Sequence, residues 1–112
     1  MKKINIVKEN REFKRIMDAG KVVKNNCYTI FVEKNKDIKY YHFGISVSKK
    51  LGNAVNRNKL KRQIKSIIDK KNYQNSFNCI IILKRDILSK SFKEKEENLY
   101  ELFRKIDIIK GE

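Results

Sequence analysis

Basic and amide side chains crowd the stretch that reads KKLGNAVNRNKLKRQIK, from residue 49 to residue 65. Arginine and asparagine offer directional hydrogen-bond donors, and lysine adds a point charge, so this mixture suits phosphates and base edges. A merely solvated surface would need only lysines. The stretch therefore predicts a surface that binds a polyanion. The candidate contacts are Lys49, Lys50, Asn53, Arg57, Asn58, Lys61, Arg62 and Lys65.

A helix is predicted to hold these side chains in fixed directions. Apolar residues recur at i, i+4, i+7 and i+8, and they are Leu60, Ile64, Ile67 and Ile68. This spacing is typical of a buried stripe. Arg57, Lys61 and Lys65 then lie one above another beside the stripe, over roughly 12 Å of the helix axis. Cations in the first helical turns oppose the helix dipole, which indicates a role in anion binding rather than in stability.

The sequence contains no motif in which catalytic residue types are grouped at a recognisable spacing. The carboxylates form no DxD or ExxH pattern, and a two-metal nuclease needs several convergent acids. His42 is the only histidine, and a lone histidine in a strand is usually structural. The segment GISVSKK lacks the GxxxxGK[ST] spacing of a phosphate-binding loop. The sequence predicts binding, with no catalytic residue and no metal ligand in the protein itself.

Charge is the most unusual property of the composition. The 112 residues carry a net charge of +15, from 28 Lys and Arg against 13 Asp and Glu. Such a field draws nucleic acid first and anionic membrane second, although an AT-rich genome would also enrich Lys, Asn and Ile. Cys27 and Cys79 lie in apolar stretches without metal-binding spacing, which indicates reduced thiols and a cytoplasmic protein. No apolar run suits a membrane span or an export signal.

The pattern of the whole chain predicts one domain over residues 1–112, with helices over 10–20, from 53 and from 91, and strands over 26–34, 40–48 and 77–84. Asn10, Asn53 and Ser91 are the expected helix caps, and Ser91 with Glu94 would form a capping box. The first two strands are expected to pair antiparallel. The third is apolar on both faces, which predicts a central and parallel position. The mixed charges of the last helix predict a solvated face.

The stretch FGISVSKKLGNAVNRNKLKRQIK resembles the protein component of bacterial ribonuclease P. The pattern of that family is a G-x-S-V-S-K-K strand end, a G-N-A-V loop and a helix with R-N-x-x-K-R-x-x-R. Lys65 stands where the family has arginine, so the charge is kept and the forked donor set is lost. ENREFKRIMDAGK and LFRK resemble the first and last helices of the family.

The resemblance implies an α/β (α+β) fold, a single-domain two-layer α-β sandwich in the order α-β-β-β-α-β-α. Its first strand would lie near residues 21–24, which the residue pattern alone does not predict. The family's β-α-β crossover is left-handed, whereas the general handedness rule favours the right-handed form.

The resemblance also implies a function. The chain would be the non-catalytic protein subunit of ribonuclease P, the endonuclease that removes the 5′ leader of precursor tRNA. The catalytic RNA would do the hydrolysis with Mg²⁺ that the RNA mainly holds, and the protein would bind that RNA and the single-stranded leader. The protein would be monomeric apart from the RNA and would not bind a membrane.

Three residues match the leader-binding cleft of the family. Phe13 matches the first helix position, Met17 stands where the family usually has phenylalanine, and Phe31 matches a strand position that is commonly tyrosine. Bases stack on such rings. The alternation of side chains along a strand supports this role for Phe31. If Tyr28 and Ile30 point into the core, Phe31 lies on the opposite face of the sheet, where a ligand can reach it.

Two other classes of function also fit a strongly basic chain. A ribosomal type of protein would use its charge only to neutralise RNA, and a self-sufficient nuclease would cut RNA without a partner. The cleft aromatics beside a directional basic helix argue against the first, and the missing set of acids argues against the second.

Overall fold

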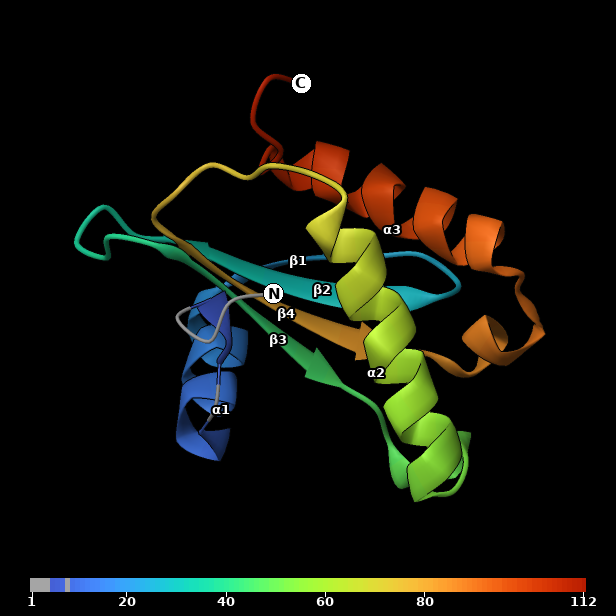
Figure 1. Ribbon diagram of the computed structural model, residues 1–112. Coiled ribbons are helices and arrows are strands. Elements are labelled where there is room, and N and C mark those ends of the chain that lie inside the picture. Colours follow the sequence, from blue (N-terminus) through green and yellow to red (C-terminus); the bar gives the residue numbers. More distant parts are fainter. Residues whose placement is uncertain (1–4, 8) are drawn as a thin grey trace.

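The computed structural model describes residues 5–7 and 9–112, in which three α-helices pack on a four-stranded sheet (Figure 1). The elements are α1 (Asn10–Ala19), β1 (Lys21–Lys24), β2 (Tyr28–Lys34), β3 (Tyr41–Ser46), α2 (Ala54–Asp69), β4 (Phe77–Leu83) and α3 (Phe92–Ile106), with short 3₁₀ turns η2 (Lys49–Leu51) and η3 (Arg85–Ser89). This order confirms the predicted α+β sandwich, including the short first strand.

The sheet has the strand order β1-β2-β4-β3. β4 pairs antiparallel with β2 and parallel with β3, so its predicted central, parallel position is confirmed. The predicted antiparallel pairing of the strands over 26–34 and 40–48 is wrong, because β4 lies between them. The reason is burial: β4 is apolar on both faces and reaches its low exposure only with a neighbour on each side.

The connection from β3 through α2 to β4 is a left-handed crossover. In Figure 1 α2 lies in front of the sheet, β3 points to the lower right, and β4 runs parallel to β3 along its upper side. When the two strands are turned to point upward with α2 still in front, β4 lies to the left of β3, and this is the left-handed sense. This confirms the handedness that the family resemblance implied. The crossover lays α2 along the edge of the sheet that β3 forms.

The main core fills the space between the sheet and the pair α2 and α3. The predicted stripe of α2 is confirmed, because Leu60, Ile64, Ile67 and Ile68 are all buried. From the sheet, Tyr28, Ile30 and Val32 point into the same core. Aromatic rings of Phe43, Tyr73, Phe77 and Phe103 meet at centroid distances of 5.0 to 5.8 Å. This core fixes the direction in which α2 presents its other faces.

The opposite face of the sheet is covered by α1. Ile16 of α1 and Ile80 of β4 are fully buried there, outside the main core. Polar contacts also join α1 to the sheet: Arg15 forms an ion pair with Glu33 at 2.8 Å, and Asn78 donates a 3.0 Å hydrogen bond to the same carboxylate. Burial alone would raise the pKa of Glu33, but the hydrogen bonds from Asn78 and Arg15 outweigh it and lower the pKa.

The helix caps agree with the sequence at two of three ends. The side chain of Asn53 accepts from the Asn56 backbone N–H, and Ser91 with Glu94 forms the predicted capping box. The predicted cap Asn10 is wrong, because Glu9 occupies the cap position of α1 and makes no side-chain cap bond. The predicted solvated face of the last helix is wrong at Lys95, which is 8% exposed and donates to Gln63 at 2.8 Å.

Alkaline pH is expected to destabilise the fold. Burial raises the pKa of Cys79, Tyr28 and Tyr73, and raises that of Tyr100 to about 12. These groups stay protonated in the folded chain while they ionise in the unfolded chain above about pH 9, so the unfolded state binds fewer protons and stability falls as pH rises. We expect the free energy of unfolding in urea to drop by about 2 to 3 kcal/mol between pH 7 and pH 10.

Lys95 has the opposite effect on the pH dependence of stability. Burial, followed by the charge of Lys59, lowers its pKa, so its contribution to stability improves as pH rises toward the unfolded pKa of lysine. A Lys95→Met variant should therefore show a steeper alkaline loss than the parent chain. A free energy of unfolding that is flat from pH 7 to pH 10 in the parent would contradict the burial of the tyrosines and Cys79.

Candidate nucleic-acid interface

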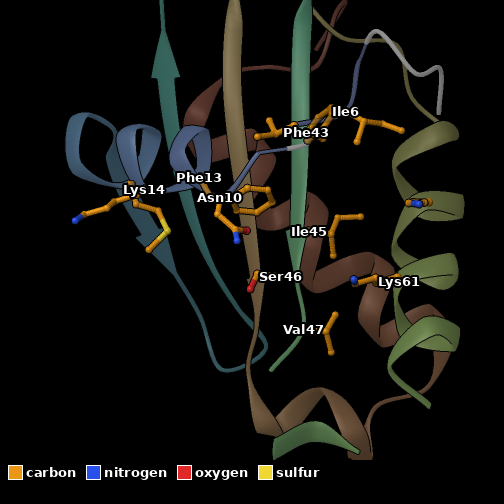
Figure 2. Close-up of a pocket in the computed structure, with 12 residues that line it drawn as sticks. Ile6, Asn10, Phe13, Lys14, Phe43, Ile45, Ser46, Val47 and Lys61 are labelled. Carbon is orange, nitrogen blue, oxygen red and sulfur yellow. The ribbon is translucent and has the colours of Figure 1, made fainter. Parts of the chain in front are cut away.

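A groove of about 620 Å³ runs beside β3, between α1 and α2 (Figure 2). Its lining comes from three parts of the chain, and the residues are Ile6, Val7, Asn10, Phe13, Lys14, Met17, Phe43, Ile45, Ser46, Val47, Lys61 and Lys65. The lining includes lysines from both helices and no carboxylate. Apolar walls flanked by cations fit an anionic ligand that also has apolar faces.

One face of α1 forms the first wall of the groove. Asn10, Phe13, Lys14 and Met17 follow the spacing i, i+3, i+4 and i+7, which places them along one side of a helix. The neighbouring side of α1 carries Ile16, which packs against the sheet. Figure 2 shows Phe13 pointing from α1 toward the strands and Lys61 pointing from α2 toward the same space.

Gly44 lets the ring of Phe13 lie directly on the sheet. A Cβ atom at this position would lie 2.6 Å from Cζ of Phe13 and 2.8 Å from Cδ1 of Ile80. These separations are shorter than carbon atoms can adopt without movement. The glycine in the GISVS segment therefore sets the depth at which Phe13 sits beside β3.

Gly44→Ala is expected to force the Phe13 ring or the whole of α1 away from the sheet. Overpacking of this kind costs about 1 to 3 kcal/mol. The measurement is the free energy of unfolding in urea, compared with Ser66→Ala on the exposed face of α2, which should stay within about 0.5 kcal/mol of the parent. An unchanged stability of Gly44→Ala, together with an unmoved Phe13 signal in NMR spectra, would contradict this close contact.

The turn before α2 presents the first cations of the basic stretch. Ser48 Oγ accepts from the Lys50 backbone N–H, and Asn53 Oδ1 accepts from the Asn56 backbone N–H at 2.9 Å. Gly52 has a φ of +136°, which L side chains rarely adopt, so the glycine is needed for this turn. Lys49 and Lys50 are left exposed at the start of the helix.

The predicted contacts of α2 divide into two groups. Lys61 and Lys65 are half-buried and line the groove opposite Phe13 and Met17. The others lie outside the groove, and we call them the basic helix surface: Lys49, Lys50, Asn53, Arg57, Asn58 and Arg62. Arg57 is half-buried, and its Nε is buried without a hydrogen-bond partner among the described residues. Both groups include residues of α2, so the groove and the basic helix surface adjoin along that helix.

Phe31 lies apart from the other two predicted cleft residues. It is half-buried on the face of the sheet that α1 covers, in register with Ile80, whose other neighbour is Gly44. It is not among the residues that line the groove. The structure therefore brings Phe13 and Met17 together with two predicted cations, while a role of Phe31 in binding stays a prediction.

Several groove residues were not predicted from the sequence. Lys14 and Asn10 share the helical face of Phe13, so the same spacing could have indicated them. Ile6 and Val7 reach the groove because Ile6 forms a parallel bridge with Phe43. Nothing in the local sequence signals that contact between distant segments.

Among residues 5–7 and 9–112, no three or more His, Cys, Asp or Glu side chains gather in a way that could hold a metal ion. In the same part of the chain, no helix is long and apolar enough to span a bilayer.

Comparison with known proteins shows the family of this chain. The family model described as Ribonuclease P matches residues 1–107. The ribonuclease P protein component of Mesoplasma florum is 39% identical over 105 residues, covering 91% of this chain and 94% of the relative. That of Mycoplasma capricolum is 37% identical over 110 residues, covering 95% and 99%.

Solved structures of RNase P proteins have the same fold as this chain. The RNase P protein of Staphylococcus aureus superposes with a TM-score of 0.84 at 31% identity, covering 93% of this chain and 96% of that one. The RNase P protein of Thermotoga maritima gives 0.79 at 27% identity, covering 88% and 94%. Sequence, order of elements and three-dimensional arrangement agree along nearly the whole chain, which therefore belongs to the ribonuclease P protein family, the protein components of that endoribonuclease.

Proposed function

We propose that this subunit of ribonuclease P holds the single-stranded 5′ leader of precursor tRNA in the groove beside β3. The observation that carries the proposal is the pairing of Phe13 and Met17 on one wall with Lys61 and Lys65 on the other, in a lining without carboxylates. Single-stranded RNA is bound by this combination of stacking side chains and cations that follow the phosphates. Phe31 lies on β2, two strands from β3 across the sheet, and would contact the leader beyond the groove.

The basic helix surface would contact the catalytic RNA. Apart from the half-buried Arg57, its cations and amides are exposed on the first half of α2 and in the turn before it, and the helix N-terminus there favours phosphate binding. Arg57 Nε is buried and makes no hydrogen bond to a described residue, and the outer donors of this guanidinium would bind phosphate oxygens. The leader and the catalytic RNA would thus be bound by adjoining parts of one helix.

The hydrolysis itself would belong to the RNA. The dispersed acids of the described residues do not fit a resident metal, so we assign Mg²⁺ to the RNA subunit and derive no step through the protein. The contribution of the protein is to hold the leader and the RNA in register, which favours the cut that gives the mature 5′ end of the tRNA. We further propose that residues 1–112 act as one RNA-binding unit, monomeric apart from the RNA and located in the cytoplasm.

Reconstitution tests the proposal. Precursor tRNA is incubated with the protein alone, with the catalytic RNA alone at low Mg²⁺, and with both, and mature tRNA without a leader serves as the control ligand. We expect cleavage at the 5′ end of the mature sequence only when both components are present. Cleavage by purified protein would show a self-sufficient nuclease instead. Co-sedimentation with ribosomes and no effect on the RNA would show a structural rRNA-binding protein.

A further inference from the structure

β3 forms one edge of the sheet, and its outer side is only partly covered. The segment with Ile6 and Val7 lies against the first half of that edge: Ile6 bridges Phe43, and the Val7 N–H donates to the Phe43 C=O at 2.9 Å. Beyond Phe43, no further bridge joins β3 to any described residue on this side. The second half of the edge therefore faces the groove.

The direction of each backbone group follows from the alternation of a strand. Because the Phe43 C=O points away from β4, the N–H and C=O of Ile45, two residues later, point the same way, and those of Gly44 and Ser46 point toward β4. Within residues 5–7 and 9–112, no hydrogen bond reaches the N–H or C=O of Ile45 on its outer side. Ile45 and Ser46 line the groove, so this open donor and acceptor border the ligand space.

We propose that the open edge of β3 at Ile45 binds the base edge of one unpaired leader nucleotide, with the N–H donating to the base and the C=O accepting from it. This rests on the function proposed above. Each RNA base carries a donor and an acceptor side by side on its Watson–Crick edge, and a strand residue with outward N–H and C=O complements that pair. Such an edge is available only in a single strand, so the contact selects against a leader that is base-paired.

Charge decides between RNA and the other natural occupant of an open strand edge, which is an extended peptide. The groove beside Ile45 is bordered by Lys14, Lys61 and Lys65 and by no carboxylate. The ring of Phe13, held close to the strand by Gly44, offers a stacking surface next to the same edge. A polyanion with flat bases satisfies the cations, the ring and the backbone groups with every nucleotide, whereas a peptide would need acidic and aromatic side chains at matching positions to do the same.

Amide hydrogen exchange of the full chain, followed by NMR, tests the proposal. The probe is a single-stranded RNA octamer with the sequence of a leader, at saturating concentration. We expect the exchange of the Ile45 amide to slow by about tenfold or more, because the N–H becomes hydrogen-bonded. The amides of Gly44 and Ser46, already paired with β4, serve as internal controls and should change little. The same octamer annealed to its complement should leave the Ile45 amide unprotected.

The outcomes separate this inference from the function on which it rests. If the octamer shifts the Phe13 ring signals but leaves the exchange of Ile45 unchanged, the leader binds in the groove and the strand-edge contact is wrong. If no groove signal moves, the proposed function fails as well. Equal protection by the duplex would overturn recognition of an unpaired base. Protection that rises with protein concentration in the absence of RNA would show edge-to-edge pairing of two copies.

A chain with an ester in place of the amide at Ile45 provides a second measurement. The substitution removes the outward N–H and keeps the side chain, so we expect leader affinity to fall about three- to tenfold. The matched control is an ester at Lys36 in the exposed loop between β2 and β3, which should leave the affinity unchanged. Equal affinity of the Ile45 ester and the parent chain would overturn the proposal.

Discussion

Replacing both groove lysines, Lys61→Ala together with Lys65→Ala, is expected to weaken binding of the single-stranded leader by about ten- to a hundredfold. Each phosphate contact to a single strand contributes about 0.7 to the slope of log affinity against log salt, so the loss of two contacts should flatten that slope by about 1.4. Both side chains are half-buried in the groove, where partial exclusion of water strengthens the attraction between charges. Fluorescence anisotropy of a labelled leader over a salt series measures both quantities.

The control is Lys36→Ala with Lys93→Ala, which removes the same charge from exposed positions outside the groove. It separates contacts in the groove from the long-range field of a chain with a net charge of +15. Neither groove lysine has a hydrogen bond or ion pair to a described residue, so the double variant should fold normally. If the two double variants weaken binding equally and with the same slope, the groove lysines do not contact phosphates.

The directions of Lys61 and Lys65 could be predicted because a helix is a local structure. One period relates the buried stripe that includes Leu60 and Ile64 to the row of cations beside it, so burial of the first fixes the direction of the second. The capping residues Asn53 and Ser91 were predictable for the same reason, since a cap depends on a few consecutive residues.

The pairing of the strands depends on contacts between distant segments, and the local pattern led to a wrong prediction. Adjacent strands joined by a short turn usually form a hairpin, but here β4 inserts between β2 and β3. The evidence for this was present in the apolar character of both faces of β4, which calls for neighbours on each side. The pattern could not say which strands those neighbours would be.

The groove was predictable only in part, because three segments must meet to form it. Phe13 and Met17 came from the family resemblance, and the helical period places Lys14 beside them. The open edge at Ile45 could not be predicted without knowing that β3 lies at the border of the sheet. Lys95 shows the same limit: its burial follows from the crossing of α2 and α3, where Gln63 receives its hydrogen bond, and not from the charge pattern of α3.

Phe13→Ala is expected to reduce affinity for the leader by about five- to a hundredfold without changing the salt slope. Stacking of a base on an aromatic ring is worth about 1 to 3 kcal/mol, and the loss of a neutral ring releases no counterion. The ring lies in the groove against Gly44 and is only partly buried, so most of the effect should appear in binding rather than in folding. Titration of a labelled leader at several salt concentrations, with urea unfolding of the same variant, measures the two effects separately.

Two further variants decide whether the ring acts by stacking or as part of the core. Phe13→Tyr keeps the aromatic face and should restore most of the affinity, whereas Phe13→Leu keeps apolar bulk and should not. Phe31→Ala is also expected to weaken leader binding, but by less than Phe13→Ala, because Phe31 does not line the groove. If Phe13→Leu binds the leader as well as the parent chain, the ring fills space between α1 and the sheet, and the leader must stack elsewhere.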